Sequence, residues 1–253
     1  MITAENYYSQ EMNMKYMSVS QYKSMLECEA GTMAKIRGEW QEEKSTALLV
    51  GSYVDAHFSK SLDLFKAQNP EIFTQKGELK SEYKHAEYII ARIERDEMFM
   101  RYISGEQQVI KTGEIEGVPF KIRIDSYHEG KAIVDLKIMR DFELIWKDGL
   151  KLTFAEAWGY DIQGVVYQHI EGNNLPFFIA AATKEKPEPD IALISVPQER
   201  LDFCLDQVKQ NAPRFADIKK GLIEPVRCER CNYCKSTKVL TGIIDYTQIG
   251  VKV

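Results

Sequence analysis

The feature that most constrains the fold of this chain is a pair of charged residues inside an apolar strand. Residues 133–138 read Ile-Val-Asp-Leu-Lys-Ile, a short apolar run that predicts a β-strand. Because side chains alternate along a strand, Asp135 and Lys137 share one face and Leu136 points to the other. A buried carboxylate is costly unless it is paired or binds a metal. The fold must therefore supply Asp135 with a partner.

A second strand precedes this one. The alternating run Lys121-Ile122-Arg123-Ile124-Asp125 predicts a strand, and residues 129–131, Glu-Gly-Lys, have turn chemistry. The two strands therefore form a hairpin. In one interpretation, Asp125 and Asp135 bind Mg²⁺ or Mn²⁺ while Lys137 orients the attacking water or offsets charge at a phosphate. In the other, Asp135 and Lys137 form an ordinary ion pair on a solvated edge strand.

A helix is expected over residues 153–170, after the hairpin. Gln163 and Tyr167 are four residues apart, so they lie on one face of this helix. The same periodicity predicts one buried stripe, made of Trp158, Ile162, Val165, Val166 and His169. The spacing of glutamine and tyrosine is weak evidence alone and gains weight from following the hairpin.

Upstream, residues 45–58 predict a helix that carries His57. The ordered set His57, Asp125, Asp135, Lys137, Gln163 and Tyr167 resembles the PD-(D/E)XK nuclease superfamily, in particular its RecB/RecE-like branch. The resemblance implies metal-dependent DNA cleavage, with His57, Asp125, Asp135 and the Leu136 carbonyl as metal ligands. The proline that names the motif is absent, because Ile124 precedes Asp125. The implied fold is α/β (α+β), a restriction-endonuclease-like αβββαβ core with a mixed sheet flanked by helices.

Three cysteines near the C-terminus, Cys228, Cys231 and Cys234, have a spacing typical of a metal or cluster site. The better candidate for a fourth ligand is Cys28, which lies among charged residues, whereas Cys204 fits a small core position. This arrangement resembles the iron–sulfur nucleases of the same superfamily and implies a [4Fe–4S] cluster that joins the two ends of the chain. Zn²⁺, bound by the same cysteines, is the alternative to the cluster. Unliganded thiols or a disulfide are disfavoured in a chain without secretory features.

Composition sets the broad class. The 253 residues are 44% hydrophobic and 28% charged, which is typical of a globular protein. We expect one nuclease domain over residues 1–253, with a helical arm at 1–45 and a Cys-rich segment at 225–240. The absence of a signal peptide or an apolar run of about 20 residues favours a cytoplasmic location. The net charge of −5 argues against a general nucleic-acid coat, so any DNA contact must rely on local basic patches.

The remaining elements follow from periodicity and turn signals. Helices are expected around residues 20–33, 46–66, 79–104 and 198–212, and strands at 106–115, 118–127, 132–138, 176–182 and 191–196. Phe142, Trp146 and Trp158 could stack on bases. For Trp158 a place in the core is favoured, and Trp146 fits either role.

The function that fits these observations best is an exodeoxyribonuclease of the phage recombination type. It would act on linear duplex DNA ends, with a single-strand annealing protein as a partner. A non-catalytic DNA-binding or assembly protein on a nuclease fold is the first alternative, although such a protein has no need of Asp125, Asp135 and Lys137 together. A zinc-ribbon interaction module is the second, and it leaves the hairpin unexplained.

Overall fold

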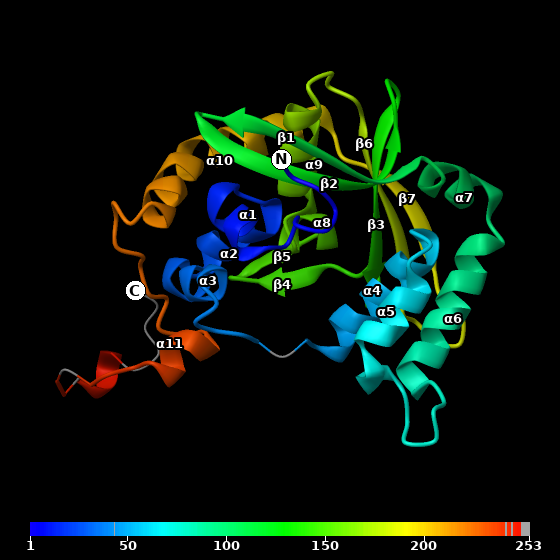
Figure 1. Ribbon diagram of the computed structural model, residues 1–253, viewed down its shortest axis with the longest axis horizontal. Helices are drawn as coiled ribbons and strands as arrows, with labels where there is room; N and C mark the ends of the chain where they lie inside the picture. Colours follow the sequence, from blue (N-terminus) through cyan, green and yellow to red (C-terminus); the bar gives the residue numbers. More distant parts are fainter. Residues whose placement is uncertain (43, 241, 244, 249–253) are drawn as a thin grey trace.

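A five-stranded mixed sheet forms the centre of the computed structural model, which describes residues 1–42, 44–240, 242–243 and 245–248 (Figure 1). The strand order is β1-β2-β3-β6-β7, with β3 and β6 parallel and the other pairs antiparallel. The strands are β1 Glu106–Ile115, β2 Val118–His128, β3 Ala132–Met139, β6 Phe177–Thr183 and β7 Ile191–Ser195. The predicted fold class, a mixed sheet flanked by helices, is thus confirmed.

Alternation along the central strands divides the core between the two faces of the sheet. On β3, Ile133 packs into one hydrophobic cluster, and Val134 and Leu136 pack into the other. Asp135 and Lys137 therefore lie on the Ile133 face. The neighbouring β6 is apolar on both faces, as expected for a strand with a parallel partner.

Helices cover both faces. On the Ile133 face lie α2 Val19–Glu27, α9 Tyr160–Glu171 and α10 Gln198–Lys219, and on the other lie α4 Thr46–Phe58, α6 Ser81–Glu94 and α7 Glu97–Ile103. The N-terminal helices α1 Gln10–Lys15 and α3 Glu29–Ile36 stand beside α2, apart from α4 and α6 (Figure 1). The remaining helices are α5 Leu62–Gln68, η1 Pro70–Ile72, α8 Phe154–Ala157, α11 Asn232–Ser236 and η2 Tyr246–Gln248. None of the helices in the described residues is long and apolar enough to cross a membrane.

Several predicted helices are two helices in the structure. The helix expected over 46–66 breaks after α4, where Lys60 adopts a left-handed conformation (φ 59°). The helix over 79–104 breaks at Asp96, whose carboxylate caps α7 by accepting the Phe99 N–H at 2.8 Å. Cys28 separates α2 from α3 by ending the first and capping the second.

The helix expected over 153–170 also breaks, and this changes the place of Trp158. Gly159 has φ 62°, a left-handed conformation that separates α8 from α9. A periodicity counted across such a break does not hold, which explains why Trp158 is exposed. His169, near the end of α9, is exposed as well, so the predicted buried stripe is wrong at both ends. A further hairpin was not predicted; it consists of β4 Ile145–Lys147 and β5 Leu150–Leu152.

Candidate active site and cysteine centre

Asp125 and Asp135 lie side by side where β2 pairs with β3. The Leu136 N–H donates to Asp125 Oδ2 at 3.1 Å, so the β3 backbone holds one carboxylate beside the other. Burial, then the charge of Asp135, raises the pKa of Asp125 well above its ordinary value. The two carboxyl groups are close enough to share a hydrogen bond when one is protonated. Crowded, desolvated acids of this kind fit a divalent cation, which neutralises both.

The two oxygens of Asp135 have different partners. Oδ1 accepts a hydrogen bond from Gln163 Nε2 at 2.6 Å. Oδ2 forms an ion pair with Lys137 Nζ but, among the described residues, has no donor in hydrogen-bond geometry. Because Asp135 is 1% exposed, this oxygen is a buried acceptor aimed at the Lys137 side. It is the atom most readily available to a metal ion.

Lys137 remains a cation in this environment. Burial alone would lower the pKa of its ammonium group, but the charges of Asp135 and Asp125 outweigh burial and raise the pKa. Nζ also lies 3.4 Å from the Leu136 carbonyl oxygen and 5.1 Å from the centre of the Tyr160 ring. A lysine with a raised pKa can stabilise negative charge at a phosphate, whereas it is a poor general base.

Gln163 and Tyr167, the predicted pair on α9, make different contacts. Gln163 holds Asp135, as described, and the Tyr167 hydroxyl donates to the Arg123 carbonyl oxygen at 2.8 Å. Tyr167 thereby ties α9 to β2 two residues before Asp125. Both side chains line the same cavity as the two aspartates. The structure thus brings together Asp125, Asp135, Lys137, Gln163 and Tyr167.

The structure does not bring His57 into this group. His57 Nε2 pairs with Glu94 Oε1 at 2.8 Å, and His57 lines neither of the two cavities at Asp125. Asp55, two residues earlier, lines the second cavity. Two residues along an α-helix turn the side chain by about 200°, so only one of the pair can face the sheet. The backbone therefore favours Asp55 over the predicted ligand His57.

Asp55 interacts electrostatically with the acidic centre. Burial raises the pKa of its carboxyl group, Asp135 raises it further, and Arg123 and Lys137 oppose the shift. Gln108 Nε2 lies 3.5 Å from Asp55 Oδ1, and Gln108 Oε1 is buried without a partner among the described residues. Sequence reasoning missed both residues. The available signal was the small pair Gly51-Ser52, which shares the helix face of Asp55 at spacings of four and three.

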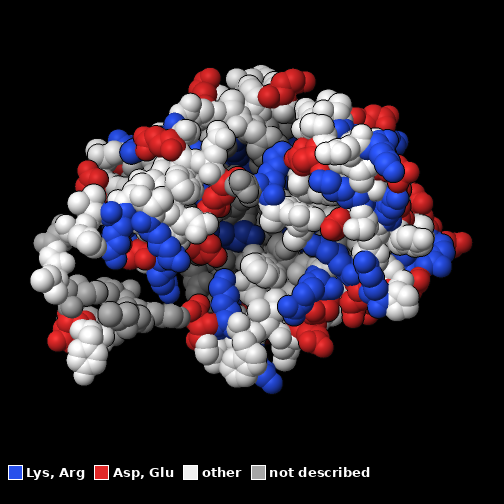
Figure 2. Space-filling view, turned by 90° about the horizontal axis from the view of Figure 1, so that it is seen from below, with Lys and Arg blue, Asp and Glu red and all other residues white. Residues whose placement is uncertain are grey.

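Two cavities of contrasting character meet at Asp125 and Lys137. The first, of about 430 Å³, has a polar and cationic wall from the N-terminal helices and β2. The second, of about 690 Å³, lies between α4 and the β4–β5 side, and its wall includes Leu48, Ile145 and Trp158. The face seen in Figure 2 is hollowed near its centre, with lysine or arginine side chains beside acidic ones.

Although the chain carries a net negative charge, basic side chains are gathered in the walls of these two cavities. The period of two along β2 places Lys121, Arg123 and Asp125 on one face, and all three line the first cavity. The remaining basic residues of the two cavity walls are Lys23, Lys35, Lys137, Arg140 and Lys184. A polyanion can therefore approach the site even though the net charge is −5.

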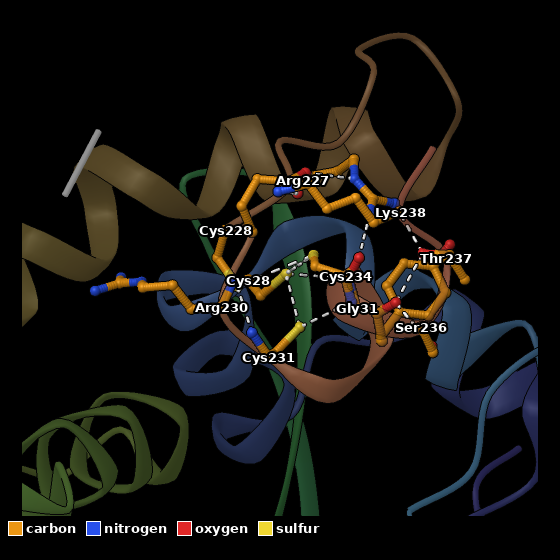
Figure 3. A network of polar contacts seen from close by, with 12 residues as sticks. Cys28, Gly31, Arg227, Cys228, Arg230, Cys231, Cys234, Ser236, Thr237 and Lys238 are labelled. Carbon is orange, nitrogen blue, oxygen red and sulfur yellow. Dashed lines mark hydrogen bonds and ion pairs between the residues drawn. The ribbon is translucent and has the colours of Figure 1, made fainter. Parts of the chain in front are cut away.

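The four predicted cysteines form a second centre at the junction of the chain ends. The sulfur atoms of Cys28, Cys228, Cys231 and Cys234 all lie within 4.8 Å of one another (Figure 3). The separations are 3.6 Å for Cys28–Cys234, 3.7 Å for Cys28–Cys231 and 4.0 Å for Cys228–Cys234. No other group of three or more potential ligand residues in the described part of the chain is so closely gathered. Cys204 is 1% exposed in the core, as predicted.

Backbone groups prepare one of these thiols for metal binding. Burial opposes ionisation of Cys228, but the N–H groups of Arg230 and Cys231 point at its sulfur and lower its pKa to about 6. Cys231 caps α11 by accepting the Cys234 N–H at 3.4 Å. A thiolate framed by N–H donors is the arrangement that metal–thiolate centres use.

Comparison with known proteins identifies the family. Residues 18–237 match the family model described as a PDDEXK-like domain of unknown function (DUF3799). The chain belongs to this family. A crystal structure from Eubacterium rectale, described as a "putative exonuclease", has 53% sequence identity and a TM-score of 0.95, and the match covers 100% of this chain and 99% of that one. A crystal structure of SSO0001 matches with 14% sequence identity and a TM-score of 0.31, over 84% of this chain and 92% of that one. No curated protein matches.

Proposed function

We propose that this protein is a divalent-metal-dependent deoxyribonuclease that degrades linear DNA from an end. The observation that carries the proposal is the buried group of Asp125, Asp135 and Lys137 at the meeting point of two cavities. A scaffold protein gains nothing from crowding desolvated acids, because each raises the cost of the other. The family match and the description of the Eubacterium rectale protein support the same activity.

The donor set fits Mg²⁺ or Mn²⁺, which prefer hard oxygen ligands. Asp125 and Asp135 would hold the ion, with the Leu136 carbonyl and Asp55 as further ligands and with Asp55 taking the place first expected for His57. When bound, such an ion lowers the pKa of a water molecule and stabilises the leaving oxygen. Gln163 keeps Asp135 oriented, and Lys137 places a fixed positive charge where the phosphate becomes more negative.

Digestion of linear and closed circular DNA tests this function. Purified protein with Mg²⁺ or Mn²⁺ should remove linear duplex DNA and leave the closed circle intact. In EDTA it should cleave neither form. The matched control is Asp135→Ala, which should be folded and inactive because a buried ligand is lost. Cleavage of both forms would indicate an endonuclease. Failure of the wild-type protein to cleave either would favour the alternative, a DNA-binding protein on a nuclease fold.

We also propose that the cysteine centre holds one Zn²⁺ and serves as a structural clip. Tetrahedral zinc with Zn–S bonds of about 2.3 Å requires sulfurs about 3.8 Å apart. The three sulfur separations of 3.6 to 4.0 Å fit that geometry. In a [4Fe–4S] cluster each cysteine sulfur binds a different iron at a corner of the cube, so the four cysteine sulfurs must lie on a much larger tetrahedron. The spacing therefore favours zinc over the iron–sulfur cluster first expected.

Metal analysis distinguishes these ions. Protein purified without added metal and without oxygen should be colourless and contain one zinc per chain. A brown protein with about four irons per chain would show instead that the sulfurs move apart to admit a cluster.

A further inference from the structure

Gln108 lies inside β1 with a backbone conformation that regular strands do not contain. Its φ is 57°, in the left-handed region, where side chains other than glycine are strained. The other non-glycine residues with positive φ in the described part of the chain all lie between helices and strands: Lys60, Glu116, Asp148, Asn174 and Glu229. Strain inside a regular element persists only where the surrounding structure imposes it, and it is concentrated at functional sites.

The strained residue lies opposite Asp125 in the sheet. The neighbours of Gln108 on β1 pair with the neighbours of Asp125 on β2, Gln107 with Ser126 and Val109 with Ile124. β2 is irregular at the same place. Ile122 and Tyr127 pack into one hydrophobic cluster, although even- and odd-numbered residues of a regular strand face opposite ways. Both strands therefore depart from regular geometry where β2 carries the acidic centre.

The Gln108 side chain extends to Asp55 on α4. Its Nε2 lies 3.5 Å from Asp55 Oδ1, and no other side chain in the described part of the chain forms a hydrogen bond or an ion pair with this carboxylate. The Gln108 amide therefore determines how the Asp55 carboxylate is rotated. Asp55 Oδ2 is left available for a ligand in the second cavity, which Asp55 lines together with Asp125.

Two features of Gln108 lower the stability of the fold. One is the strained φ, and the other is Oε1, a buried acceptor without a partner among the described residues. The only other buried side-chain oxygen without a partner in this part of the chain is Asp135 Oδ2, on the strand at the other side of Asp125. Glycine at position 108 would remove both features, so the glutamine has no advantage for folding.

We propose that Gln108 is a positioning residue of the metal site, which holds the Asp55 carboxylate in the orientation that binds the ion. The inference rests on the proposed nuclease function and adds a residue from β1, a strand that contains none of the predicted site residues. The left-handed backbone then has a role, because it directs the amide toward α4. Residues that orient metal ligands in this way contribute to affinity without touching the metal.

Gln108→Gly separates metal binding from folding. Glycine adopts a φ of 57° without strain, so in EDTA the variant should unfold at or above the wild-type temperature. Because the amide is lost, the affinity for Mn²⁺ measured by calorimetry should fall by about 10- to 100-fold, the usual loss for such residues. Gln108→Asn is the second variant: asparagine tolerates this φ but is too short to reach Asp55, so its Mn²⁺ affinity should fall similarly.

A double variant tests whether the effect passes through Asp55. In an Asp55→Ala background, Gln108→Gly should change the remaining Mn²⁺ affinity by less than about twofold, because the carboxylate that it orients is already absent.

The adjacent glutamine provides the matched control. Gln107 Nε2 donates to the carbonyl oxygens of Ile103 at 2.7 Å and Gly105 at 2.9 Å, contacts that belong to the fold alone. Gln107→Ala should therefore lower Tm in EDTA and keep the Mn²⁺ affinity within about twofold of wild type.

Unchanged Mn²⁺ affinity in the two folded Gln108 variants would overturn this inference, and so would an equal loss of affinity in the Asp55→Ala background. If the wild-type protein binds Mn²⁺ and cleaves linear DNA, either result leaves the nuclease function standing. Loss of affinity as expected, in a protein that does not cleave DNA, refutes the nuclease function and leaves the metal site. A wild-type protein that binds no Mn²⁺ refutes both proposals.

Discussion

Asp55 and His57 offer a sharp test of the site, because they are two residues apart on α4 and face opposite ways. Asp55 lines the cavity at Asp125, and His57 pairs with Glu94 at 2.8 Å. We expect Asp55→Ala to lose most metal binding and activity, and His57→Ala to keep both. The pair of variants shares one helix, so general effects on α4 are matched.

The expected metal-dependent rise in Tm follows from the linkage between metal binding and folding. Mn²⁺ at about one hundred times its dissociation constant stabilises the wild-type protein by about 2.7 kcal/mol. For a chain of this length, that raises Tm by about 5–10 °C. If loss of the Asp55 carboxylate weakens binding about a hundredfold, the same Mn²⁺ concentration contributes only about 0.4 kcal/mol, a shift of about 1 °C. His57→Ala should retain the full shift, since His57 lines neither cavity at Asp125. Loss of its partly exposed ion pair with Glu94 should lower the free energy of unfolding by less than about 1 kcal/mol.

Thermal unfolding in EDTA and in Mn²⁺, with DNA cleavage in parallel, provides the measurement. In EDTA, Asp55→Ala should unfold at or above the wild-type temperature, because burial already disfavours the ionised Asp55 carboxyl. This excludes misfolding as the reason for a lost metal shift. Suppose that His57→Ala abolished the Mn²⁺-dependent rise in Tm and Asp55→Ala preserved it. Asp55 would then not be the metal ligand, and the sequence-based prediction of His57 would be right.

Further predictions concern the rest of the two centres. Lys137→Ala should lower turnover by about 10²–10³-fold while the Mn²⁺-dependent rise in Tm is retained, because the lysine acts on transition-state charge; calorimetry showing no metal binding would refute this. Because the pKa of Asp125 is raised in the folded protein, the protonated Asp125 carboxyl stabilises the fold. This stabilisation is complete below the pKa of the carboxyl in the unfolded chain and is lost as pH rises through its pKa in the folded protein. Asp125→Asn should therefore be more stable than wild type in EDTA at pH 7–8 and should show a weaker fall in Tm with pH; a lower Tm throughout would contradict the argument. Cys28→Ser should release the metal and lower Tm by more than about 6 °C, whereas Cys204→Ala, a core truncation, should cost about 1–2 kcal/mol. An unchanged Tm for Cys28→Ser with metal retained would exclude Cys28 as a ligand.

Much of the site could be predicted because it depends on short, rigid periods. The pleat of β3 alone places Asp135 and Lys137 on one face, and the turn at Gly130 brings Asp125 beside them. The four cysteines of the second centre could also be predicted, because three closely spaced cysteines need only one further residue to complete a set of four metal ligands. These features need little knowledge of how distant elements pack.

Choices that depend on helix phase could not be made from the sequence. α4 carries apolar side chains on most of its circumference, so its pattern does not show which face meets the sheet, and the sequence alone does not decide between Asp55 and His57. The burial of Trp158 was wrong for a related reason. Because Gly159 separates α8 from α9, the periodicity of α9 does not extend back to Trp158. The Trp158 side chain, predicted in the core, instead lines the second cavity.

The position of Cys28 connects the cysteine centre to the acidic one. Cys28 lies at the joint between α2 and α3, and both helices contribute to the wall of the first cavity, through Lys23 and Ser24 before the joint and through Thr32 and Lys35 after it. The angle between the helices therefore sets the distance between these polar groups and Asp125. A metal held by Cys28 and the C-terminal cysteines would fix that angle, and the bidentate contact of Arg214 with Glu29 supports it. Because the four cysteines come from both ends of the chain, a cavity wall near the N-terminus would then depend on residues that follow the last helix of the core.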